Sequence, residues 1–297
     1  MLFLMLIVTA AAPGCIDIAG ADMRHVEREE KRFSTGAKPQ VTLSTFDGAI
    51  EIRPWDKNEV LVVVEKRAVD KAAADAIAVR AEQEGDRVTV DVTGPKRTGI
   101  SIFGNIGRSA RLIVSLPATS DVNAKSGDGS IDVESVAGKM ELRSGDGSIH
   151  GRALKGEVTA HTGDGSIHLV DLDGALTVDT GDGSIHVNGK LSTVRARSGD
   201  GSMTIRADQG SAASADWDIT TGDGSVTLEI PGDFNGELDA HTGDGGVHVD
   251  DVGLTEAPSD ESERHSRRRS TVRGRLGSGG KTVRIRTGDG SITLRRS

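Results

Sequence analysis

Aspartates recur along this chain at a spacing that could serve cation binding. They lie in repeated copies of the phrase Ser/Thr-Gly-Asp-Gly-Ser followed by an aliphatic residue, and an eighth copy surrounds Asp289. A row of carboxylates could bind Ca²⁺, which prefers oxygen ligands. Alternatively, each aspartate could accept a hydrogen bond from the backbone of its own turn. We expect this structural role, because the spacing departs from the calcium-binding nonapeptide repeat. The carboxylates of the alternative, a weak cation edge, are Asp128, Asp146, Asp164, Asp182, Asp200, Asp223 and Asp244.

Three histidines, His150, His168 and His186, occupy equivalent places in consecutive copies of the phrase. We expect them to point outward in a row. A zinc ion needs its ligand nitrogens at about 2.0–2.1 Å from one centre. Two neighbouring histidines could converge on such a point, but the third would lie at the end of a line. The pattern therefore predicts a surface ladder, with no metal site and no cofactor.

Nucleophilic catalysis is not indicated either. Ser130 and Ser148 recur in every turn, so they serve the repeat, and no Gly-x-Ser-x-Gly elbow lies between a strand and a helix. Aromatic residues make up 2% of the chain, which leaves only Trp55 and Trp217 as large sugar-stacking platforms. We predict a protein that is not an enzyme and has no catalytic residues.

The period of the phrase predicts the fold. The first four intervals between its aspartates are 18 residues each, and a short fixed period is typical of a solenoid. Within one copy, Ile167 and Leu169 alternate with polar residues, as do Leu176 and Val178, which indicates two strands per coil. We predict an all-β, single-stranded β-solenoid with coils of about 18 residues, stacked about 4.8 Å apart. Glycine is expected at the corners for its left-handed backbone and for its missing Cβ.

The remaining segments are expected to cap, tether or interrupt this stack. Val69–Glu84 is predicted to be the one N-terminal helix, because its alanines and aliphatics form an apolar face. The last coil is expected to place Arg284, Arg286, Arg295 and Arg296 at the end of the stack. The expected divisions are a signal peptide and lipobox at 1–15, a tether at 16–38, capping strands with the helix at 39–120, and the repeat solenoid at 121–297 with a flexible insertion at 251–280.

The two ends of the chain indicate a location and a charge asymmetry. Met1–Gly14 is apolar and uncharged and precedes Cys15, the only cysteine, in the run Ala12-Pro-Gly-Cys15. This run resembles a bacterial lipobox and predicts lipidation of Cys15 and membrane anchoring. The net charge is −9, yet residues 264–297 hold eleven Lys and Arg and one acid. Such asymmetry favours an interaction surface, including head-to-tail self-association. Nucleic acid is not expected, because aromatic residues do not interleave the basic ones.

Two stretches resemble the bacterial putative-adhesin domain family. One runs from Arg32-Phe33 through Asp47-Gly48 to Trp55-Asp56, and the other is the Gly-Asp-Gly array. The resemblance covers most of residues 32–297 and implies a β-solenoid on envelope proteins, without catalytic residues to carry over. We therefore expect an extracytoplasmic lipoprotein that binds an envelope polymer or another envelope protein. A self-assembling scaffold similar to bactofilins is the alternative, and a glycan-active β-helix enzyme is less favoured.

Overall fold

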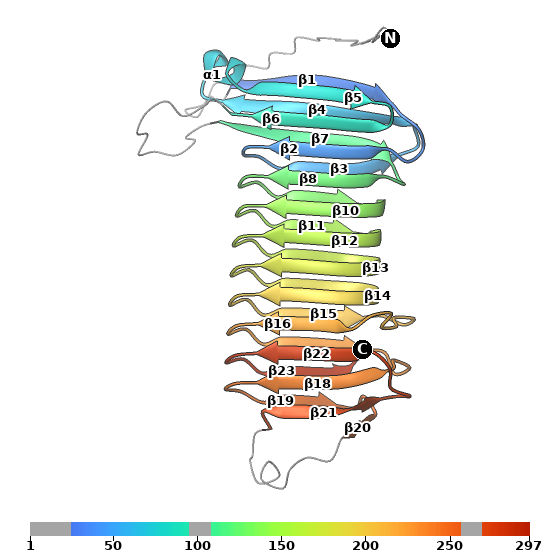
Figure 1. Cartoon of the computed structure of the whole chain (residues 1–297). Coiled ribbons are helices and arrows are strands. Elements are labelled where there is room, and N and C mark those ends of the chain that lie inside the picture. The colour runs from blue at the N-terminus through green and yellow to red at the C-terminus, as the bar shows by residue number, and fades with distance from the viewer. Residues whose placement is uncertain (1–24, 95–107, 257–268) are drawn as a thin grey trace.

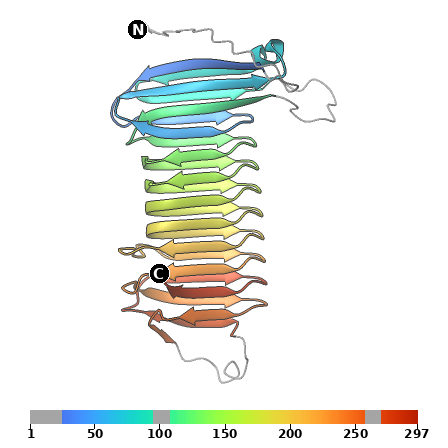
Figure 2. The same ribbon diagram turned by 180° about the vertical axis from the view of Figure 1, so that it is seen from behind.

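The computed structural model describes residues 25–94, 108–256 and 269–297. Its strands form one continuous hydrogen-bonded sheet that winds into two faces, and the coils lie one above another (Figures 1 and 2). The two faces are called face A and face B below. The all-β, solenoid-like fold predicted from the repeats is confirmed.

The strands of each face follow one another in a defined spatial order. On face A the order is β1 (His25–Ser34), β4 (Glu59–Ala68), β7 (Ser109–Pro117), β3 (Ile50–Trp55), β9 (Ile131–Glu134), β11 (Ile149–Arg152), the first halves of β13 (Ile167–Thr180) and β14 (Ile185–Ser198), β15 (Met203–Ala207), β17 (Val226–Ile230), β23 (Ile292–Arg296) and β19 (Val247–Asp250). On face B the order is β5 (Ala78–Glu84), β6 (Arg87–Thr93), β2 (Gln40–Thr45), β8 (Asp121–Ser126), β10 (Ala137–Ser144), β12 (Lys155–Thr162), the second halves of β13 and β14, β16 (Trp217–Thr221), β22 (Thr282–Thr287), β18 (Gly236–Thr242), β21 (Thr271–Leu276) and β20 (Leu254–Glu256).

The core is a set of aliphatic files between the two faces. Ile131, Ile149, Ile167 and Ile185 lie directly opposite one another on neighbouring parallel strands, and each is at most 1% exposed. Trp217, one of the two candidate sugar-stacking platforms, is fully buried in this core. Each coil supplies few apolar side chains, so the fold is stabilised by contacts between coils.

The helix predicted over Val69–Glu84 is wrong for most of its length. The only helix among the described residues is α1 (Lys71–Asp75), whose first turn is capped by Asp70, accepting a hydrogen bond from Ala73 N at 2.7 Å. Ala78–Glu84 is instead strand β5, antiparallel to β6. Val79 and Ala81 on β5 face Val92 and Val90 on β6, so strand pairing and burial override the helix propensity of alanine.

Two segments expected to be irregular also contain strands. His25–Ser34, placed in the tether, pairs along its whole length with β4. Thr271–Leu276, placed in the flexible insertion, pairs antiparallel with β18. Both pairings cover edges of the stack that would otherwise be open. The middle of the predicted insertion, residues 257–268, lies outside the described residues.

The last coil is not at the end of the stack, contrary to expectation. β22 lies between β16 and β18, and β23 lies between β17 and β19 (Figure 1). The arginines expected on the final edge therefore lie inside the stack. At the other end β2 and β3 are likewise inserted, between β6–β7 and β8–β9.

Candidate functional site

Buried hydroxyl groups connect the coils at the corner where the chain turns from face B to face A. Ser144 Oγ donates to the carbonyl of Gly129 in the preceding coil at 2.9 Å and accepts from Gly147 N at 3.1 Å. The residue before each Gly-Asp-Gly holds the same place, and all of these residues are buried. The ladder comprises Thr45, Ser126, Ser144, Thr162, Thr180, Ser198, Thr221, Thr287 and Thr242. Sequence reasoning missed this role, although Ser or Thr at every copy was a visible signal.

The corner glycines are required for close approach, not for a left-handed backbone. A Cβ atom at Gly147 would lie 2.3 Å from the carbonyl oxygen of Gly129 below it. Neither Gly145 nor Gly147 has positive φ. At the Gly-Asp-Gly corner the expectation of a left-handed backbone is therefore wrong, whereas the expectation that a Cβ would collide with the next coil is confirmed. At the opposite corner Gly138, Gly156 and Gly174 do have positive φ, as expected.

The predicted aspartates form one row along this corner. All seven members of the predicted cation edge are exposed, Asp289 lies between Asp223 and Asp244, and Asp47 extends the row at the N-terminal end. Burial, and to a lesser degree the neighbouring Asp128 carboxylate, raises the pKa of Asp47. Asp47 could have been found from sequence, because Thr45-Phe-Asp-Gly matches the repeated phrase.

The aspartate side chains do not bond to their turns. Among the described residues, none of the seven carboxylates accepts a hydrogen bond from backbone, so the predicted side-chain-to-backbone turn is wrong. In four turns a hydroxyl takes that role: Gly129 N, Gly147 N, Gly201 N and Gly290 N donate to the side-chain oxygens of Ser126, Ser144, Ser198 and Thr287. Within the same described residues, no three His, Cys, Asp or Glu side chains are placed to hold a metal ion.

The three histidines form the outward ladder that was predicted, and this ladder lies on face A. His168 and His186 stack with their ring centroids 5.0 Å apart and 8° between planes. The Nδ1 atom of His150 lies 3.1 Å from Asp132 Oδ1. Burial of the ring, and then the neighbouring His186, His150 and Arg152, lower the pKa of His168. The lowered pKa favours the neutral form of the His168 ring.

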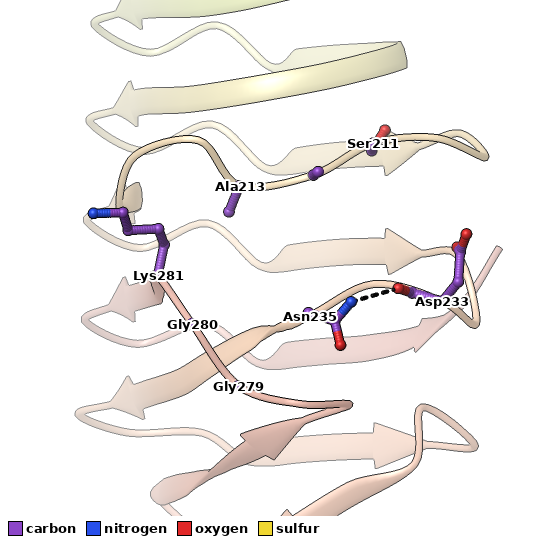
Figure 3. A pocket seen from close by; sticks show the side chains of 8 residues that line it. Ser211, Ala213, Asp233, Asn235, Gly279, Gly280 and Lys281 are labelled. Atoms are coloured by element: carbon purple, nitrogen blue, oxygen red, sulfur yellow. Dashed lines mark hydrogen bonds between the residues drawn. The ribbon is translucent and has the colours of Figure 1, made fainter.

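A hollow lies at the opposite corner, where the loop after β17 steps past the inserted last coil (Figure 3). Its volume is about 380 Å³, and residues from the loops after β15, after β17 and before β22 line it. The side-chain amide of Asn235 already has partners within the protein. Its Nδ2 donates to Asp233 O at 3.0 Å, and its Oδ1 accepts from Ser278 N at 2.7 Å.

The predicted lipid anchor falls on residues outside the described part of the chain. Cys15, the predicted lipidation site, lies there. Among the residues that the structure describes, no helix has the length and apolar character needed to cross a membrane.

Comparison with known proteins identifies a family. The Toastrack DUF4097 family matches residues 40–295. No curated protein matches. A structure described as a putative cell adhesion protein from Clostridium sporogenes ATCC 15579 shares 13% identity, with a TM-score of 0.32, covering 92% of this chain and 100% of that one. A putative lipid binding protein from Parabacteroides distasonis ATCC 8503 shares 14% identity, with a TM-score of 0.42, covering 90% and 96%. A putative adhesin from Bacteroides fragilis NCTC 9343 shares 10% identity, with a TM-score of 0.37, covering 90% and 97%.

Proposed function

Because this chain belongs to the Toastrack DUF4097 family, we propose that it is a non-enzymatic binding module of the bacterial cell envelope. Its partner is an extended envelope polymer or another envelope protein, contacted along the outward faces of the solenoid. We further propose that it is extracytoplasmic and anchored by lipid on Cys15, as the lipobox-like run Ala12-Pro-Gly-Cys15 indicates.

The observation that carries this proposal is the regular repetition of polar groups along an uncovered face. On face A, equivalent outward positions stack directly opposite one another from coil to coil. Neighbouring positions are about 4.8 Å apart in such a sheet. A long row of this kind presents polar side chains at a regular spacing, which suits an extended partner that binds through several weak contacts in series. The members of the row are Asp132, His150, His168, His186, Thr204, Thr227, Thr293 and His248.

A retention assay with matched variants tests the proposal. The purified chain is immobilised and exposed to solubilised envelope fractions, and the retained material is treated with protease or with glycan hydrolases to identify its class. Thr204→Lys with Thr227→Lys changes face A, and Thr159→Lys with Thr177→Lys makes the same change on face B. We expect the face A pair to reduce retention and the face B pair to leave it unchanged. No retained material, or equal loss with both pairs, would overturn the proposal.

A self-assembling scaffold is the second candidate function. The free edge of β1 favours it, because within the described residues its ten-residue backbone pairs on one side only, with β4. The charge asymmetry of the sequence gives it less support than expected, since the basic last coil lies inside the stack. Sedimentation at several protein and salt concentrations separates the two functions. Growth of long assemblies with concentration supports the scaffold, and a constant small species supports the binding module.

A further inference from the structure

The inserted last coil differs in charge from the two coils that hold it. The segments 217–235 and 236–250 each contain four carboxylates and no Lys or Arg. The segment 281–297 contains five Lys and Arg and one aspartate. A basic coil therefore lies between two acidic coils. We call the space between the acidic coils 217–235 and 236–250, which the basic coil fills, the acidic slot.

The charges meet directly in the slot. On face B, Asp218, Arg284 and Asp239 lie opposite one another on β16, β22 and β18. On face A, Glu229, Arg295 and Asp250 do the same on β17, β23 and β19. Both rows alternate in sign, and opposite charges at directly facing positions stabilise a sheet.

Ion pairs join the last coil to the acidic coils on both faces. Arg286 Nη2 lies 2.6 Å from Asp239 Oδ2, and Arg295 Nε donates to Glu229 Oε1 at 2.9 Å. Burial alone would raise the pKa of Asp239, but its ion pairs with Arg286 and Arg273 lower it. The carboxylate is thus held in its charged form by contacts that the last coil partly supplies.

Stacking in the order of the sequence would bring like charges together. With the last coil removed, Asp218 would face Asp239 and Glu229 would face Asp250, since all three coils share one register. The apolar side chains show no such conflict, because Ile219, Ile285 and Ala240 fill the same file. This file of the core accepts either order of the coils, whereas the facing charges favour the observed one.

The last coil also bonds to the slot as every other coil bonds to its neighbours. Thr287 Oγ1 donates to Gly224 O at 2.7 Å, and Thr242 Oγ1 donates to Gly290 O at 2.7 Å, so the hydroxyl ladder passes through it on both sides. A glycine-rich turn with positive φ at Gly277, Gly279 and Gly280 precedes it. The same coil from a second copy would make the same bonds, which is the condition for exchange of an element between protomers.

We propose that the acidic slot is a binding site for a basic two-strand coil, filled by the chain's own last coil and able to accept the last coil of a second copy. Two copies would then exchange their C-terminal coils reciprocally. The partner is recognised by alternating charge across a shared register.

Three full-length variants test this proposal. The slot variant carries lysine at the four acidic positions Asp218, Glu229, Asp239 and Asp250. The coil variant carries glutamate at Arg284, Arg286 and Arg295. The combined variant carries all seven changes in one chain, which restores opposite charges within the molecule. We expect the slot and coil variants to melt lower than the wild type, and the combined variant to recover most of the lost melting temperature.

Exchange is measured by refolding the slot and coil variants together and weighing the products by native mass spectrometry. We expect a heterodimer of the two variants that neither forms alone. A control chain with Arg80→Asp and Lys125→Glu, two exposed positions outside the slot, should form no heterodimer with the slot variant. If the combined variant melts as low as its parents, charge does not specify the slot. If it recovers but the mixture yields no heterodimer, exchange between copies is refuted.

Discussion

The buried hydroxyl ladder gives the sharpest test of how the coils are held together, and Ser144 is its best position. Its Oγ donates to Gly129 O and accepts from Gly147 N, and the residue is 5% exposed. Ser144→Ala leaves one carbonyl and one N–H without their partner, and each such group costs about 1–3 kcal/mol when buried. Because water reaches part of this corner, we expect a total loss of about 2 kcal/mol, at the lower end of that range. For a large domain this lowers the melting temperature by about 4–8 °C.

Thermal unfolding followed by circular dichroism measures the effect, with two controls in the same background. Ser144→Thr keeps the hydroxyl and adds the methyl group that Thr162 carries in the next coil, so it should melt near the wild type. Ser166→Ala removes an exposed hydroxyl that donates to no described group and should also be nearly silent. Equal melting of Ser144→Ala and the wild type, or an equal fall with Ser144→Thr, would refute the role assigned to the ladder.

Four further predictions follow from the same structure. Ile167→Asp places a charge in a fully buried aliphatic file and should cost several kcal/mol, whereas His168→Asp on the exposed face should be nearly silent; equal melting would contradict the strand register. Burial favours a higher pKa for Glu65, but its ion pairs with Arg28 and Arg67 lower the pKa below its ordinary value of 4.5. The stability that these ion pairs contribute at higher pH should therefore be lost as the pH falls through the lowered pKa. The loss, followed by thermal unfolding at several pH values, should be less steep in Glu65→Gln. Cys15→Ser should move the protein from membrane to soluble fractions of cells, and unchanged membrane retention would exclude lipid anchoring at this residue. Millimolar Ca²⁺ should change the melting temperature only slightly, and no more than other salts do, because any salt screens the repulsion along the aspartate row. A rise in melting temperature that only Ca²⁺ produces would instead show that the row is a binding site.

The central coils could be predicted from the sequence because each copy of the repeat meets the same surroundings. Ile149 and Ile167 each have an identical neighbour above and below, so period-two alternation was enough to place them inward. The outward position of His168 follows from the same alternation. Repetition turns a local pattern into a tertiary one, because the tertiary partner of each residue is another copy of that pattern.

The turn chemistry could be predicted only in part, because several groups compete for the same bonds. Aspartate and serine can both accept a hydrogen bond from backbone nearby in the chain. The structure gives that bond to the serine, as in Gly129 N to Ser126 Oγ at 3.0 Å, since the serine points into the corner and the aspartate points to solvent. The direction of a side chain at a corner depends on the coil beneath it, which a single copy of the repeat does not show.

The error over Ala78–Glu84 has a related cause. Its alanines favour helix locally, whereas its partner β6 lies beyond a turn at Gly85 and presents Val88, Val90 and Val92 to the core. Burial of an apolar edge outweighs the small differences in helix propensity between residues. Sequence reasoning weighed only the local term.

The order of the last three coils shows what repetition leaves undetermined. A stack of near-identical coils gives each coil many acceptable neighbours, since one aliphatic file matches another. Outward charges carry the missing information, because a like-charged pair at facing positions opposes one order and an opposite pair favours another. The sequence already contained the signal: eight carboxylates without a Lys or Arg in residues 217–250, followed by a basic coil at the C-terminus. The charges on the outer faces therefore favour one order of these coils over the other. The same facing charges that order the coils within one chain can pair a coil of one chain with the coils of a second.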